Sequence, residues 1–166
     1  INNILNLDSE KQIASWLPPY HDTGLVGVIM NSLYRGAHCF LMNSNDFLIN
    51  PYKWLKLISD YKTYINIAPN FGYDYCIKKI TDDQKQTLDL SNWKIAINGS
   101  EPINIKTINS FYEAFKNCGF SKEAFYPCYG LAESTLMVSS KKIGAALKTV
   151  NLDLSELSNN KIKIAR

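Results

Sequence analysis

The sequence of 166 residues lacks the features that mark several large classes of protein. Its four cysteines form no CxxC pair, and its two histidines, His21 and His38, do not complete a zinc ligand set with them. No apolar run approaches the roughly 20 residues of a membrane span, and no basic stretch followed by an apolar core opens the chain. We therefore expect reduced thiols in a cytoplasmic protein without a membrane span.

An excess of one charge is also missing. The 18 Lys and Arg residues against 15 Asp and Glu residues give a formal net charge of +3, which does not favour a nucleic-acid partner. A hydrophobic content of 46% is sufficient for a packed core. Because the chain opens with Ile1 and ends at Arg166 inside a polar, basic stretch, we expect a piece of a larger protein.

What the sequence does contain is a regular alternation of short β-like runs and helical stretches. The helical patterns begin near Asp22, Pro51, Asn70 and Pro102. This alternation predicts an α/β fold, with a mostly parallel sheet covered by helices on both faces. We expect the strands at residues 12–17, 37–42, 64–68, 94–97 and 125–129, with a further one at 136–139.

The helix expected after Asp22 carries apolar residues all round. Asp22 is suited to cap its start and Gly36 to end it. Val26 and Met30 lie on the face opposite the main apolar stripe, so we expect the helix to be buried on most sides. The stripe itself consists of Leu25, Val28, Ile29 and Leu33.

Ligands of such sheets bind beyond the carboxyl ends of the strands. One exit, residues 98–102 with the sequence NGSEP, includes Gly99, where the missing Cβ atom lets a flat ligand lie against the backbone. Asn-Gly also favours a hairpin turn. Since Pro102 and an amphipathic helix follow instead of a second strand, the hairpin loses support, and a ligand contact stays open beside an ordinary turn.

A second exit, residues 126–135 with the sequence YPCYGLAEST, combines Tyr129, Gly130 and Glu133. A tyrosine ring can stack on a base, and a carboxylate can hold a magnesium ion. The alternative is a buried tyrosine, a turn glycine and a solvated glutamate at a helix start.

A third exit, in the run WLPPYHDTGL, places His21 beside Asp22. A hydrolase triad would also need a serine, but the chain contains no GxSxG elbow. A histidine beside an N-capping aspartate is more often structural.

Taken together and in this order, the segments resemble the adenylate-forming enzymes, a superfamily of acyl-CoA synthetases, luciferases and adenylation domains of peptide synthetases. The similarity is greatest to the fatty acyl-AMP ligases, through WLPPYHDTGL, PNFGYDYCIKKI, LDLSNWKIAINGSEP and EAFYPCYGLAEST, and it covers residues 12–139. The resemblance implies that residues 1–166 are a fragment of the N-terminal AMP-binding domain. It also implies ATP-dependent activation of a fatty acid to an acyl-adenylate. The alternatives are an acyl-CoA synthetase and, from another class, a non-catalytic binding or scaffold module.

The resemblance implies roles for single residues in holding ATP and Mg²⁺. Tyr129 would stack on one face of adenine, and Glu133 would bind the magnesium ion that bridges the phosphates. Gly130 and Leu131 would shape the backbone past the α-phosphate. The other face of adenine would be covered by the backbone of Gly99, Ser100, Glu101 and Pro102.

For the acyl group, the resemblance places His21 at the mouth of the pocket near the carboxylate, so that His21 and Glu133 are the expected catalytic residues. Thr23, Gly27 and Gly72 would line the pocket. The phosphate loop, the ribose-binding aspartate and the catalytic lysine of these enzymes have no counterpart in residues 1–166. We therefore expect the isolated chain to be inactive.

Two features resemble the acyl-AMP ligase branch in particular. Ala132 stands where many members of the superfamily have a threonine, which leaves phosphate contact to backbone amides or to Ser134 and Thr135. Residues 141–166 resemble, more loosely, the start of the extra segment that these ligases carry, although an ordinary solvated connection is the alternative. Both features imply transfer of the acyl group to an acyl carrier protein.

Overall fold

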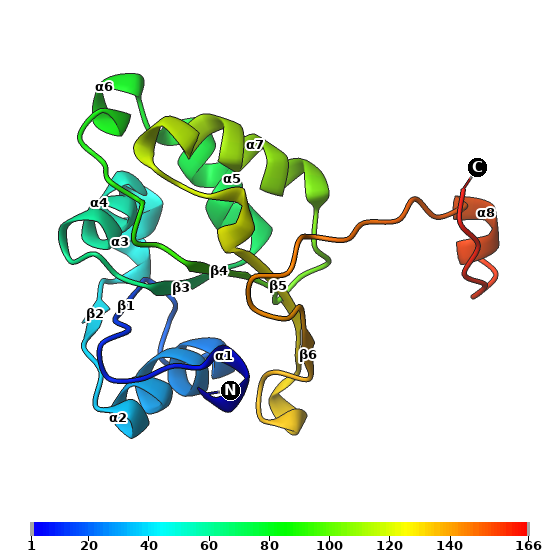
Figure 1. The fold of residues 1–166 in the computed structure, drawn as a ribbon, viewed down its shortest axis with the longest axis horizontal. Helices are drawn as coiled ribbons and strands as arrows, with labels where there is room; N and C mark the ends of the chain where they lie inside the picture. Colours follow the sequence, from blue (N-terminus) through cyan, green and yellow to red (C-terminus); the bar gives the residue numbers. More distant parts are fainter. Residues whose placement is uncertain (1, 166) are drawn as a thin grey trace.

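The computed structural model describes residues 2–165, in which six strands form a sheet with the order β2-β1-β3-β4-β5-β6. Strands β1 to β5 pair in parallel, and β6 pairs antiparallel with β5. The expected α/β fold with a mostly parallel sheet is confirmed (Figure 1). The strands are β1 (Ile13–Ser15), β2 (Cys39–Leu41), β3 (Ile65–Ala68), β4 (Ile95–Asn98), β5 (Phe125–Tyr129) and β6 (Ser139–Ser140).

One face of the sheet is covered by helices α3 (Ser44–Ile49), α4 (Tyr52–Asp60), α5 (Asn70–Lys79) and α7 (Ile105–Phe115) (Figure 1). The helices expected after Pro51, Asn70 and Pro102 are therefore present, whereas the short α3, which Asn43 caps, was not predicted. Between the helices and the sheet lies an aromatic core that includes Trp54, Tyr73, Trp93, Phe111 and Phe125. Three short helices lie in the connections from these helices back to the sheet. They are α6 (Asp82–Lys85) between α5 and β4, and η2 (Lys116–Cys118) and η3 (Lys122–Ala124) between α7 and β5.

The opposite face carries α1 (Asn2–Leu5), the π-helix η1 (Thr23–Met30) and its continuation α2 (Asn31–Arg35). The core on this face is largely aliphatic. Successive side chains of a strand point to opposite faces of the sheet, so the strand residues here are those that do not point into the aromatic core. Its buried members are Leu5, Ile13, Val28, Ile65, Ile67, Ile95, Ile97 and Tyr126.

The helix expected over residues 22–36 is present, with Asp22 accepting a hydrogen bond from the Thr23 amide at its start and Gly36 (φ 65°) at its end. Its burial on most sides is wrong: Leu25 is 44% exposed and Leu33 is 76% exposed. The first half is a π-helix, whose i→i+5 hydrogen bonds turn the side chains away from the positions of a 3.6-residue helix. The buried positions of η1 are instead Thr23, Gly24, Gly27 and Val28.

The last expected strand is displaced. Thr135 (φ 52°) and Leu136 (φ 80°) take left-handed conformations that a strand does not allow, so β6 begins only at Ser139. The 3-10 helix η4 (Ala132–Ser134) precedes this bend.

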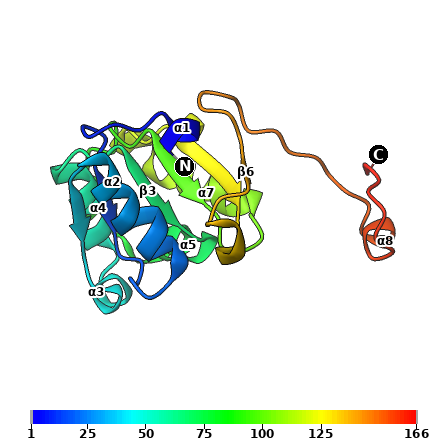
Figure 2. The ribbon, with the colours of Figure 1, turned by 90° about the horizontal axis from the view of Figure 1, so that it is seen from below.

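Beyond β6 the chain leaves the sheet and ends in a small unit of its own. There α8 (Leu154–Leu157) begins at Asp153, and Leu152 forms an antiparallel bridge with Ile164. Both views show this unit apart from the sheet and its helices (Figure 1; Figure 2). Over residues 2–165, no helix combines the length and the apolar character needed to cross a membrane.

Candidate functional site

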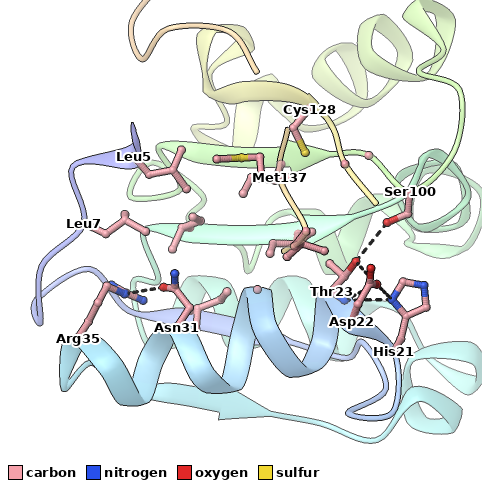
Figure 3. Close-up of a pocket in the computed structure, with 18 residues that line it drawn as sticks. Leu5, Leu7, His21, Asp22, Thr23, Asn31, Arg35, Ser100, Cys128 and Met137 are labelled. Carbon is pink, nitrogen blue, oxygen red and sulfur yellow. Dashed lines mark hydrogen bonds and ion pairs between the residues drawn. The ribbon is translucent and has the colours of Figure 1, made fainter. Parts of the chain in front are cut away.

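Two cavities meet at the carboxyl edge of the sheet. From β1 the sheet continues to β2 on one side and to β3 on the other, which makes the carboxyl ends of β1 and β3 a topological switch point. The outer cavity, of about 380 Å³, opens there between Trp16, Pro18 and Phe71. The inner cavity, of about 230 Å³, lies between η1 and the aliphatic face of the sheet (Figure 3). His21, Thr23 and Ser100 line both cavities and so mark where they join.

The inner cavity is apolar along most of its length. Isoleucines from three strands form its floor: Ile13, Ile65, Ile67 and Ile97. The helix contributes a narrow stripe of residues spaced by four, namely Thr23, Gly27, Asn31 and Arg35. Because a π-helix has more residues per turn than an α-helix, this spacing keeps the stripe nearly parallel to the helix axis.

The end of the inner cavity near the carboxyl edge is polar. His21 Nδ1 lies 2.6 Å from Asp22 Oδ1, which also accepts from the Thr23 amide at 2.6 Å. The Thr23 hydroxyl lies 3.3 Å from the same oxygen and 3.4 Å from Ser100 Oγ. Because Nδ1 also accepts from the Thr23 amide at 3.1 Å, Nδ1 is occupied by contacts within the chain, and Nε2 is the ring nitrogen available to a ligand.

The loop after β4 is held in place by α5. Asn70 Nδ2 donates to the Pro102 carbonyl at 2.8 Å, Asn70 Oδ1 accepts from the Asn104 amide at 3.1 Å, and Glu101 Oε1 accepts from the Phe71 amide at 3.0 Å. Ser100 has φ 66°, a left-handed conformation that is uncommon for serine and is frequent at functional sites. The alternative of a hairpin at Asn98–Gly99 does not apply, since β4 leads to α7, as the sequence favoured.

The end of β5 lies beside this loop, because β4 and β5 are paired neighbours. Tyr129 is 63% exposed there. At Gly130 an added Cβ atom would lie 1.5 Å from the Leu136 carbonyl oxygen, so only glycine fits. Glu133, in η4, is exposed, and over residues 2–165 no side chain or amide bonds to its carboxylate.

The structure thus brings together part of the residue set expected from the sequence. His21, Thr23, Gly27, Gly99, Ser100 and Gly130 line the inner cavity, and Glu101 lines the outer one. Gly72 lines neither cavity. It packs against Trp16, a residue of the outer cavity, and an added Cβ atom would lie 2.9 Å from the Trp16 ring. The remaining expected residues lie at the surface beside the cavities: Pro102, Tyr129, Leu131, Ala132 and Glu133.

Burial keeps the walls of the inner cavity largely neutral. Removal from water raises the pKa of the Cys128 thiol to about 11, so this wall residue stays protonated near neutral pH. Burial also lowers the pKa of Arg35, which nevertheless remains a cation. Among residues 2–165 no three His, Cys, Asp or Glu side chains gather as a ready metal site. A single free carboxylate such as Glu133 suits Mg²⁺, which is usually held by one or two carboxylates together with substrate phosphates and water.

Several residues of the inner cavity were not predicted from the sequence. The spacing of four from Thr23 through Asn31 to Arg35 was a detectable signal, although a 3.6-residue period obscures it. The others reach the cavity through tertiary folding alone: Leu5, Leu7, Cys128, Leu136 and Met137.

Comparisons with known proteins agree with this architecture. The profile of the family described as AMP-binding enzyme matches residues 1–160. The chain is 42% identical over 155 residues to the medium-chain-fatty-acid–[acyl-carrier-protein] ligase TtuA of Teredinibacter turnerae, covering 93% of this chain and 24% of the relative. It is 39% identical over 156 residues to the corresponding ligase JamA of Moorena producens, covering 94% of this chain and 26% of the relative.

Among solved structures, the fatty acyl-adenylate ligase from L. pneumophila in complex with acyl adenylate and pyrophosphate superposes with a TM-score of 0.95 at 45% identity. The match covers 99% of this chain and 29% of that structure. The chain therefore spans about a quarter of the length of the curated relatives that it matches. Both the sequence profile and the superposition identify the chain as a member of the AMP-binding enzyme family.

Proposed function

We propose that this chain is part of a longer enzyme, which uses ATP to activate a fatty acid to an acyl-adenylate. One observation carries the proposal: an apolar inner cavity ends at a polar cluster beside the strand exits of Ser100 and Tyr129. An apolar chain with one carboxylate matches such a cavity in shape and polarity. The names of the relatives, which are fatty-acid ligases and fatty acyl-adenylate ligases, support the same reaction.

In this proposal the acyl chain occupies the inner cavity, with its carboxylate near His21, Thr23 and Ser100. Adenine lies between the exposed ring of Tyr129 and the backbone of residues 99–102. The backbone of Gly130, Leu131 and Ala132 passes the α-phosphate. The tight packing of Gly130 against Leu136 holds that backbone in place.

The reaction is attack of the fatty carboxylate on the α-phosphate of ATP, with departure of pyrophosphate. A carboxylate is already a nucleophile, so the protein has to position two anions rather than remove a proton. The ring of His21, held by Asp22, orients the carboxylate through Nε2. Glu133 would hold Mg²⁺, which neutralises phosphate charge in the transition state.

The acceptor of the acyl group is proposed to be an acyl carrier protein. Ala132 and the small unit around α8, which lies apart from the sheet, support this branch, and we propose that residues 141–166 begin the ligase-specific insertion. An enzyme that uses ATP and a carrier protein would work in the cytoplasm.

The test gives the complete enzyme a fatty acid, ATP, Mg²⁺ and either coenzyme A or a holo carrier protein, and identifies the products by mass. We expect acyl-adenylate and carrier protein that bears the acyl group, with little acyl-CoA. Efficient formation of acyl-CoA would show that coenzyme A is an acceptor and would overturn the proposed carrier-protein acceptor, while the proposed adenylation would stand. Absence of any acyl-adenylate would overturn the proposed reaction.

A further inference from the structure

We propose that the end of the inner cavity opposite His21 is a stop that limits the length of the acyl chain, formed by Leu5 and Leu7 and held in place by Arg35. The proposal deepens the proposed function, on which it rests. It names Leu5 and Leu7 as specificity-determining residues and Arg35 as a positioning residue.

The cavity has two unlike ends (Figure 3). His21, Thr23 and Ser100 lie at one end, beside the strand exits, while Leu5 and Leu7 lie at the other. The reacting carboxylate has to lie near the nucleotide, so the methyl end of the acyl chain points toward the leucines. Leu5 is 1% exposed and Leu7 is partly buried against the same aliphatic core, so both present apolar surface to the chain terminus.

Arg35 fixes the segment that carries these leucines. Its Nη1 donates to the carbonyl of Asp8 at 2.8 Å and to the carbonyl of Lys11 at 2.7 Å. Its Nε donates to Asn31 Oδ1 at 2.8 Å, which sets the guanidinium against the helix. These bonds tie residues 8–11 to α2 directly after Leu7, because a planar guanidinium can bond in several fixed directions at once.

Lys11 closes the same segment on itself. Its ammonium lies 3.0 Å from Asp8 Oδ2 and donates to the Asn6 carbonyl at 2.5 Å. The loop that follows Leu5 and Leu7 is therefore braced from within and from α2, and the leucines cannot retreat readily from a longer chain.

The size of the cavity indicates which chains fit. Its volume of about 230 Å³ ends at the leucines. The stop therefore favours acids short enough to fit between His21 and the leucines, and each methylene that cannot be buried is expected to lower kcat/KM about three- to fourfold.

The test measures pyrophosphate release by the complete enzyme with saturated acids from hexanoate to palmitate. Leu7→Ala opens the stop and Leu7→Phe narrows it, so the preferred length should increase in the first variant and decrease in the second. Arg35→Met keeps the aliphatic stem but loses the donors, and it should raise kcat/KM for long acids about tenfold relative to kcat/KM for octanoate. Leu33→Ala, on the outward side of the same helix, is the matched control and should leave the profile unchanged.

Opposite shifts in the two Leu7 variants would support the stop even if Arg35→Met folds poorly. Active Leu7 variants with an unshifted chain-length profile would overturn the stop alone. Failure of the unaltered enzyme to form acyl-adenylate from every acid would overturn the proposed function and the stop together, so the two failures are distinguishable.

Discussion

The two faces of the sheet are built from different side chains. The face under α4, α5 and α7 is filled by aromatic rings in mutual contact, with Trp54 and Trp93 centred 5.4 Å apart and Tyr73 and Phe111 5.0 Å apart. The face under η1 is aliphatic and hollow, and it holds the inner cavity. A filled face contributes stability and a hollow face can accept a ligand, so the two tasks are divided between opposite sides of one sheet.

Buried polar groups strengthen the contrast. On the aromatic face, Asn66 Oδ1 accepts from the Ala14 amide at 2.8 Å and from the Thr63 hydroxyl, which joins β1 to β3 where only Ile13 and Ile65 are paired. Tyr73 OH donates to the Ile97 carbonyl at 2.9 Å. These bonds connect elements, whereas the polar groups of the hollow face line the two ends of a cavity, with His21, Thr23 and Ser100 at one end and Asn31 and Arg35 at the other.

The largest expected effect is on stability, at the centre of the aromatic face. Trp54 is fully buried, and its Nε1 donates to the Ala14 carbonyl at 3.2 Å. We expect Trp54→Ala to lower the free energy of unfolding by about 3–5 kcal/mol, because it leaves a cavity and an unpaired carbonyl. Urea unfolding of the chain measures this, with Trp54→Phe as a milder variant. A loss below that of Trp54→Phe would contradict a stabilising role for this face.

A smaller effect is expected at Glu133, where a substitution should lower activity and leave stability unchanged. In the complete enzyme, Glu133→Ala should lower acyl-adenylate formation by roughly two to three orders of magnitude, the scale of one lost preorganised charge contact. Because Glu133 is exposed and unpaired within residues 2–165, unfolding by urea should be unchanged.

The matched control for Glu133 is Glu113→Ala, an exposed glutamate on α7 that pairs with Lys116 on the aromatic face. It should leave ATP-dependent pyrophosphate release unchanged. Near-normal activity of a folded Glu133→Ala enzyme would remove the magnesium assignment.

Asn70 tests whether the division between the faces is complete. It belongs to α5, yet its side chain holds the loop that follows β4 through Pro102 and Asn104. Loss of two such bonds is expected to raise KM for ATP about tenfold in Asn70→Ala, with little change in KM for the fatty acid. Steady-state kinetics with each substrate varied in turn decides this. An equal rise in both KM values would indicate general loosening instead.

Strong periodic patterns allowed much of the fold to be predicted. The apolar runs around Ile65, Ile95 and Phe125, each followed by an amphipathic helix or preceded by one, require parallel βαβ units, and these place Ser100 and Tyr129 at one edge. Local sequence was sufficient because each element's pattern agrees with its final environment.

Local sequence was insufficient for η1 and for the closed end of the inner cavity. An added Cβ atom at Gly24 would lie 2.1 Å from the Pro18 carbonyl oxygen, so the start of η1 depends on a close approach that no helical period reveals. The left-handed Leu136 likewise results from the bend after η4. Leu5 and Leu7 reach the cavity from a segment far from η1 in sequence, which Arg35 bonds through the carbonyls of Asp8 and Lys11.

The smallest effect concerns the pH dependence of stability, to which a thiol on each face contributes. Burial raises the pKa of Cys128, on the hollow face, to about 11 and raises that of Cys76, in the aromatic core, well above 9.0. A thiol whose pKa is raised by folding binds its proton more tightly in the folded state, so its contribution to stability is complete below the unfolded pKa, near 9, and is lost as the pH rises toward the folded pKa. Each such thiol should lower the free energy of unfolding by up to about 1.4 kcal/mol per pH unit in that window.

Urea unfolding at pH values from neutral to alkaline should show a steeper loss of the free energy of unfolding for the unaltered chain than for Cys128→Ala. Identical slopes would mean that Cys128 reaches water through the inner cavity and titrates as an exposed thiol.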